Sequence, residues 1–195
     1  MEMRTTKPWP LIVAYVAMLI VIFVLPFFTA TGYSIIKNTT SQLGAQLTPN
    51  AWLMNIVFIG LGAASIVTGW RWLPIYWFHR IVLTIFGVSL ILASFFRHVP
   101  LDLTLPFDAK EDSMHSLFAS LTGFSFTIFA VATAYIQKPV FDRVLAATIG
   151  VTATLLSILM FYLPDWAGIW QRLIFMMSFG WMIYTFGTPS QHEKQ

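Results

Sequence analysis

The sequence predicts an all-α integral membrane protein, a bundle of six transmembrane helices with both termini in the cytoplasm. Of its 195 residues, 57% are hydrophobic and only 10% are charged, whereas a soluble domain is about 25% charged. So few charged side chains cannot cover a soluble surface, and much of the surface must therefore face lipid. Apolar stretches of about 20 residues, the length that crosses a hydrocarbon core of about 30 Å, recur along the chain. The loops between them differ in their Lys and Arg content, which predicts the orientation.

The same composition excludes several classes of protein. Soluble enzymes, nucleic-acid modules and disordered tails all need more charge or polarity than this chain has. The formal net charge of +3 is too small to indicate nucleic acid as a partner. The absence of cysteine excludes disulfides, a thiolate nucleophile and Cys-ligated metal. We therefore expect no nucleic-acid partner and no cofactor.

The predicted spans leave too few residues for a second domain, so residues 1–195 are expected to form one domain. Arg4 and Lys7 precede the first span, as in a signal peptide, but its apolar run exceeds the roughly 7–15 residues of such a leader and is interpreted as an uncleaved helix. The six spans are 9–30, 51–69, 75–96, 114–136, 144–163 and 168–186.

Lys and Arg in the short loops favour a cytoplasmic N-terminus. In that orientation the inner side carries seven of them and the outer side four. The inner set is Arg4, Lys7, Arg71, Arg80, Lys138, Arg143 and Lys194, and the outer set is Lys37, Arg97, Lys110 and Arg172.

Ionisable side chains are nearly absent from the centres of the spans, and the informative polar residues gather near the outer ends. Asn55, His115 and Arg172, on three different helices, are expected at similar depth and are predicted to converge in the folded bundle. Such a layer above an apolar bundle is typical of a pocket for a lipid headgroup or a small amphiphile. Arg172 is expected either to extend to the headgroups or to point inward at Asp108, Asp112 or an anionic lipid headgroup. The candidate ligand-binding residues are Asn55, His98, Asp108, Asp112, His115 and Arg172.

An enzyme is the alternative interpretation of the second outer loop. Asp112 and His115 are three residues apart at a predicted helix start, so they can share one face. His115 would be a general base or a metal ligand, with Asp112 orienting it, in an enzyme that acts on lipid headgroups. The spacing matches no established metal motif, and no metal is expected. Instead, Arg97 and Lys110 are expected to neutralise the loop's aspartates, and His115 to bond a carboxylate or a loop carbonyl.

Two local features concern helix packing and helix ends. Gly60, Ala64 and Thr68 are spaced four residues apart, and small residues at this spacing let helices approach closely, within the bundle or in an oligomer. Asn50 is expected to cap the second span. Asp112 or Ser113 is expected to cap the fourth.

Two segments together resemble a known family. They are Ser41-x-Leu43-Gly44 followed by Asn50-Ala51-Trp52-x-x-Asn55, and the Pro/Asp-containing loop that leads to His115. The chain resembles a bacterial and archaeal domain-of-unknown-function family of small six-helix membrane proteins, distantly similar to the Frag/DRAM/Sfk-like membrane proteins. The resemblance implies a six-helix fold in the plasma membrane and brings no established activity.

Three functions therefore stay open. The first is a non-enzymatic multi-pass protein that binds membrane lipids or a small amphiphile in an outward-facing polar pocket. The second is the headgroup enzyme built on His115 and Asp112. The third is a structural or accessory subunit whose partners carry the activity.

Overall fold

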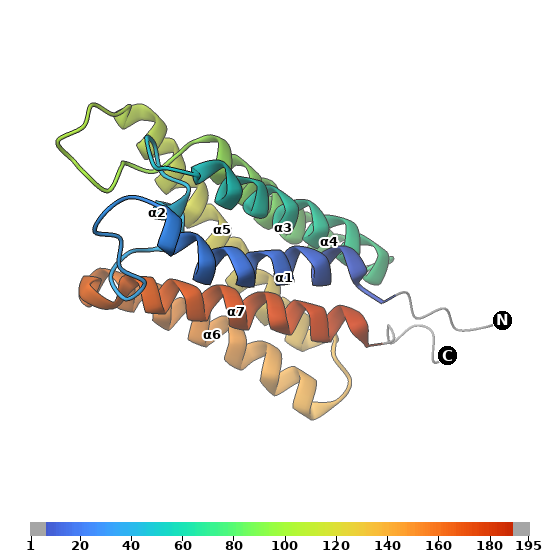
Figure 1. Ribbon diagram of the computed structural model, residues 1–195. Helices are drawn as coiled ribbons and strands as arrows, with labels where there is room; N and C mark the ends of the chain where they lie inside the picture. Colours follow the sequence, from blue (N-terminus) through green and yellow to red (C-terminus); the bar gives the residue numbers. More distant parts are fainter. Residues whose placement is uncertain (1–6, 189–195) are drawn as a thin grey trace.

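The computed structural model describes residues 7–188, which form a bundle of long helices (Figure 1). No strand occurs within that range, so the all-α class is confirmed. The helices are α1 (Trp9–Val24), α2 (Thr40–Leu43), α3 (Ala51–Trp72), α4 (Trp77–Phe95), α5 (Ala109–Ile136), α6 (Val140–Tyr162) and α7 (Ala167–Gly187), with 3₁₀ turns η1 (Leu25–Phe28) and η2 (Pro164–Trp166).

The long helices form a ring. Each packs against its neighbour in sequence, and α1 closes the ring by contacting both α3 and α7. The start of α1 and the end of α7 lie at one end of the bundle, and residues 29–50 and 97–108 lie at the other (Figure 1). We call the end that carries these two long loops the cap. The polar residues singled out by the sequence are therefore gathered at one end of the molecule.

Among the described residues, five helical segments are long and apolar enough to cross a membrane, namely Trp9–Phe28 (α1 with η1), α3, α4, α5 and α6. This confirms a membrane protein with several spans. The remaining long helix, α7, has 21 residues and lies in the same bundle. Gln171 and Arg172 lower its hydropathy, so the sixth span stays a prediction.

The N-terminal boundary of α5 differs from the expected one. Asp108 caps the helix, because its Oδ1 accepts from the backbone N–H groups of Lys110 (2.8 Å) and Glu111 (3.1 Å). The prediction that Asp112 or Ser113 is the cap was wrong, since the apolar run begins several residues after the helix does. With 28 residues, α5 is about 42 Å long at about 1.5 Å per residue. It is longer than the hydrocarbon core requires.

Asn50 occupies the N-cap position of α3, as expected, but its side-chain oxygen accepts no hydrogen bond from the first turn, so that part of the expectation was wrong. Asn50 adopts the left-handed conformation (φ 59°), which asparagine tolerates better than most residues. Its Nδ2 donates to the carbonyl of Phe28 at 2.8 Å. Asn50 therefore ties the start of α3 to the end of η1.

Close approach of α3 and α4 depends on Gly62 rather than on Gly60. A Cβ on Gly62 would clash with the backbone oxygen of Gly87, whereas one on Gly60 would meet nothing within 4 Å. Ala64 and Thr68 are buried inside the bundle. An oligomer contact through Gly60, Ala64 and Thr68 stays a prediction, and most of that face is used within the chain.

Candidate functional site

Arg172, in the first turns of α7, is the most deeply buried charged residue of the cap. Its side chain is only 2% exposed. The guanidinium donates to the carbonyls of Ile22, Ile35, Asn38 and Gly168 and to the hydroxyl of Tyr33, at 2.8–3.3 Å. Arg172 therefore points inward, as one of the two expectations had it, and the expected extension to the headgroups was wrong. Its partners within the chain are not Asp108 or Asp112, so that part of the expectation was also wrong. Backbone dipoles stabilise this charge in place of a carboxylate.

Pro26 explains why one of these carbonyls is available. In a continuous helix the carbonyl of Ile22 would accept from the N–H of residue 26, and proline has none. Nε and Nη2 of Arg172 both donate to this carbonyl at 3.3 Å. A freed backbone group near lipid needs such a partner. Arg172 of α7 thus supplies the hydrogen bonds that the carbonyl of Ile22 lacks within α1.

The start of α7 fixes the first cap loop in the same place. The N–H of Ile169 donates to the carbonyl of Ile36 at 3.2 Å. Gly168 allows this approach, since a Cβ there would clash with the backbone oxygens of Ile35 and Asn38. Burial raises the pKa of the Tyr33 phenol, although Arg172 beside it acts in the opposite direction. Tyr33 therefore stays protonated at neutral pH, and its hydroxyl donates to the carbonyl of Thr39 at 2.8 Å.

A second network joins the end of α4 to the start of α5. His98 contacts Asp112 through Nδ1 and Oδ1 at 2.5 Å, and the same Oδ1 accepts from the N–H of Val99 at 3.0 Å. The rings of His98 and His115 are stacked with centroids 5.3 Å apart. Asp112 thus orients His98 rather than His115.

His115 is buried and bonds backbone carbonyls, one of the two arrangements expected for it. Its Nδ1 lies 2.8 Å from the carbonyl oxygens of both Ala93 and Phe96. Since both partners are acceptors, Nδ1 carries the proton. His115 therefore holds the last turn of α4 against α5.

The expected ion pairs in the second cap loop were wrong in detail. Arg97 pairs with Glu111, with Nε and Oε1 2.9 Å apart. Asp108 is used as the cap of α5, and Asp102 accepts from the N–H and hydroxyl of Thr104. Those two hydrogen bonds lower the pKa of the exposed Asp102 carboxyl. Within residues 7–188, Lys110 has no ion-pair partner.

Two glutamines that the sequence analysis did not select connect the cap. Gln46 donates from its backbone N–H to the carbonyl of His98 (2.9 Å), and its side chain bonds the carbonyls of Arg97 and Asp108 and the N–H of Asp108. Gln171 accepts from the N–H and hydroxyl of Thr40. Their only signal in the sequence was an amide within an apolar segment, which does not identify its partners.

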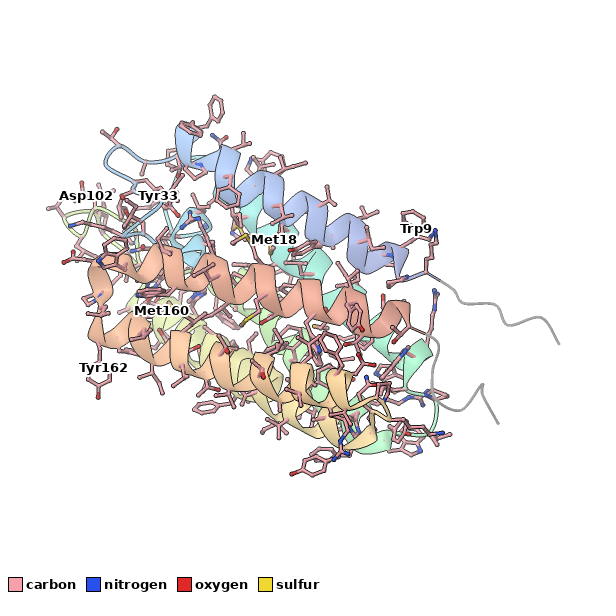
Figure 2. The ribbon with its side chains drawn as sticks, turned by 90° about the horizontal axis from the view of Figure 1, so that it is seen from below. Trp9, Met18, Tyr33, Asp102, Met160 and Tyr162 are labelled. Atoms are coloured by element: carbon pink, nitrogen blue, oxygen red, sulfur yellow. The ribbon has the colours of Figure 1, made fainter. Side chains whose placement is uncertain are left out.

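Asn55, His115 and Arg172 lie near the cap, but each has its own set of hydrogen-bond partners. Asn55 donates to the carbonyl of Gly44 at 3.2 Å. No hydrogen bond joins any two of these three side chains in the described part of the chain. Figure 2 shows Tyr33 and Asp102, from the two cap loops, at the end opposite Trp9.

A shallow pocket opens beside the second network. Its volume is about 280 Å³, and it is lined by Phe95, Phe96, Asp108, Lys110, Glu111 and Met114. Phe96 is held by stacking on Phe118, with ring centroids 5.5 Å apart. Asp108 is the one predicted site residue that lines the pocket. Within residues 7–188, no group of three or more His, Cys, Asp or Glu side chains could hold a metal ion.

The long apolar helices and the polar cap define a multi-pass helical membrane protein. The family model described as "Protein of unknown function (DUF998)" matches residues 12–186, and the chain belongs to this family. The resemblance to a domain-of-unknown-function family is thereby confirmed. The distant similarity to Frag/DRAM/Sfk-like proteins stays a prediction. No curated protein and no solved structure matches the chain.

Proposed function

We propose that this chain crosses the plasma membrane six times, with both termini in the cytoplasm, and binds a lipid or small amphiphile at its outward-facing cap. The 21 residues of α7 extend about 32 Å as a helix, enough to cross a hydrocarbon core of about 30 Å. An even number of spans agrees with the start of α1 and the end of α7 lying at one end (Figure 1).

The observation that carries the binding proposal is the pocket between the end of α4 and the start of α5. Since α5 is about 12 Å longer than the hydrocarbon core, roughly eight of its residues extend beyond it. With the other end of α5 at the inner interface, the extension runs from Ala109 to Ser116, and Asp108 directly precedes it. The polar part of the pocket then lies among lipid headgroups.

An apolar track leads from the pocket toward the membrane centre. Met114 lines the pocket, and Leu117, Leu121 and Phe124 follow it at spacings of three, four and three residues, which places all four on one helical face. The last three are exposed, at 56%, 40% and 72%. An acyl chain can lie along this face while its headgroup occupies the pocket. A soluble ligand would make no use of the track.

The surrounding residues position the pocket rather than contact the ligand. His115 holds the carbonyl of Phe96, and Gln46 holds Asp108. All of the guanidinium N–H groups of Arg172 are directed at protein acceptors, so this side chain supports the cap and offers nothing to a headgroup.

Filling the pocket tests the proposal. The full chain in detergent is mixed with dioleoyl phosphatidylethanolamine, dioleoyl phosphatidylglycerol or dioleoylglycerol, and retained lipid is measured by native mass spectrometry. Met114→Trp is expected to lower retention of the preferred lipid severalfold. Leu155→Trp, on the exposed face of α6, is the matched control and should behave as wild type. Equal retention of all three lipids by Met114→Trp and wild type would refute the proposal.

The pairing of His98 with Asp112 favours an enzyme as the second candidate function. Asp112 accepts from Nδ1 of His98, which leaves the Nε2 lone pair of a half-buried ring available as a general base. This role belongs to His98, since His115 is held between carbonyls. The hydroxyl of Ser113, the residue after Asp112, donates to the carbonyl of Ala109. Release of headgroup from the same phospholipids by wild type, but not by His98→Ala, would establish this activity.

A further inference from the structure

The charges around the pocket indicate which class of lipid it takes. We propose that the pocket binds a zwitterionic phospholipid headgroup, with its phosphate at Lys110 and its ammonium group between Asp108 and Glu111. This inference rests on the lipid binding proposed above and adds the chemistry of the headgroup.

Two carboxylates at the pocket each keep one oxygen unused. Asp108, the N-cap residue of α5, accepts both hydrogen bonds from the first turn of the helix through Oδ1. Glu111 accepts from the N–H and Nε of Arg97 through Oε1, both at 2.9 Å. Within the described residues, Oδ2 of Asp108 and Oε2 of Glu111 accept no hydrogen bond. They are acceptors for an ammonium group, and the aromatic rings of Phe95 and Phe96 add attraction for a cation.

Lys110 supplies the opposite charge. It lines the same pocket and makes no ion pair within residues 7–188. An ammonium group with three donors on a flexible stem binds phosphate oxygens as a point charge. Lys110 lies in the first turn of α5, where the helix dipole also favours an anion.

The balance of these charges selects against other headgroups. Arg97 offsets the negative charge of Glu111, and Lys110 offsets that of Asp108, so the net charge of the pocket is close to zero. Both a positive group and negative groups can still bind a ligand there. An anionic headgroup would match Lys110 but place its charge beside two carboxylates. A headgroup without charge would leave Lys110 and both free oxygens without a partner. A zwitterion satisfies all three groups.

The size of the pocket agrees with a headgroup as the occupant. About 280 Å³ is just below the roughly 300–1,000 Å³ of sites that enclose a drug-sized ligand. The acyl chains therefore stay outside, along the face that begins at Met114.

The test compares headgroups that carry identical dioleoyl chains. The full chain in detergent is given phosphatidylethanolamine, phosphatidylglycerol or diacylglycerol, and native mass spectrometry measures retention. We expect about tenfold preference for phosphatidylethanolamine, the effect of one charge-assisted hydrogen bond. Lys110→Gln should weaken retention of both phospholipids. Asp108→Asn keeps a side-chain oxygen that can accept the N-cap hydrogen bonds of α5. It should weaken retention of phosphatidylethanolamine and strengthen retention of phosphatidylglycerol.

The controls use another ion pair of the cap. Lys37 and Asp165 form an exposed pair at 3.0 Å, outside the pocket, so Lys37→Gln and Asp165→Asn should leave the preference unchanged. Preference for phosphatidylglycerol or diacylglycerol would overturn the headgroup inference while leaving lipid binding intact. Displacement of phosphatidylethanolamine by equimolar glycerophosphoethanolamine would show that a free headgroup suffices, and would overturn the assignment to a lipid. Retention of none of the three would overturn the proposed function itself.

Discussion

At the scale of single residues, the cap shows how a buried charge is kept without a counterion. Carbonyl oxygens of α1, of the first cap loop and of α7 surround the guanidinium of Arg172. Each carbonyl contributes a partial negative charge, and Pro26 releases one of them for this purpose. The planar guanidinium can donate in several directions at once, which a lysine cannot do.

Replacing Arg172 is therefore expected to destabilise the fold through the acceptors that it leaves. Arg172→Lys should lower the free energy of unfolding by about 2 kcal/mol, and Arg172→Met by more, because buried carbonyls lose their donors. Unfolding of the detergent-solubilised chain by a denaturant measures this. Arg143→Met, at an exposed position, is the control, expected within about 0.5 kcal/mol of wild type. Wild-type stability of Arg172→Met would show that the carbonyls do not need the guanidinium.

The sequence could single out Arg172, His115 and Asp112 but not their partners. A charge or an imidazole in an apolar span is conspicuous by itself. Its partners here are largely backbone carbonyls and the ring of His98, from a helix end and loops that have no periodicity. Gln46 was missed for the same reason. Residue type indicates that a polar group needs partners, while the course of the loops decides which ones it has.

At the scale of helices, hydropathy predicts existence and approximate length well, because backbone groups in lipid must bond within their own helix. Helix ends were less predictable. The apolar run of α5 begins at Met114, but Asp108 caps the helix in the polar segment before it. Close helix contacts also depend on rotation about the helix axis. Gly60 and Gly62 differ by two residues, about 200° around the helix, and only Gly62 faces α4.

Matched glycine substitutions on α3 test where the helices touch. Gly62→Ala would place a Cβ against the backbone of Gly87 and should destabilise the chain by about 1–3 kcal/mol. Gly60→Ala meets open space and should be neutral or stabilising by up to about 1 kcal/mol, from helix propensity. Denaturant unfolding compares the two variants. The opposite order would place the tight contact on the Gly60 face.

Gly168 provides the corresponding test for the first cap loop. In Gly168→Ala the new methyl group would meet the backbone oxygens of Ile35, Ile36 and Asn38, so the loop must move away from α7. We expect a loss of about 2 kcal/mol and faster trypsin cleavage after Lys37. Gly123→Ala, with nothing within 4 Å of the new Cβ, is the control. Unchanged cleavage in Gly168→Ala would show that the loop tolerates the methyl group.

At the scale of the whole molecule, the bundle has two different ends. The cap contains the hydrogen-bonded loops and the pocket, whereas the opposite end has the shorter connections from α3 to α4 and from α5 to α6 (Figure 1). Basic residues that favour the cytoplasm lie at that end, including Arg71 in the last turn of α3 and Lys138 between α5 and α6. In the proposed orientation, this charge distribution places the pocket on the outer side of the membrane.

Single cysteines test this orientation, because the chain has no cysteine of its own. Asp102→Cys and Asp165→Cys lie at exposed positions of the cap. An impermeant maleimide should label both in intact cells. Lys138→Cys, exposed between α5 and α6, and His192→Cys, near the C-terminus, should react only after the membrane is opened. Labelling of Lys138→Cys but not Asp102→Cys in intact cells would invert the orientation. Outside labelling of His192→Cys together with Asp102→Cys and Asp165→Cys would show that α7 does not cross, since an odd number of spans puts the two termini on opposite sides.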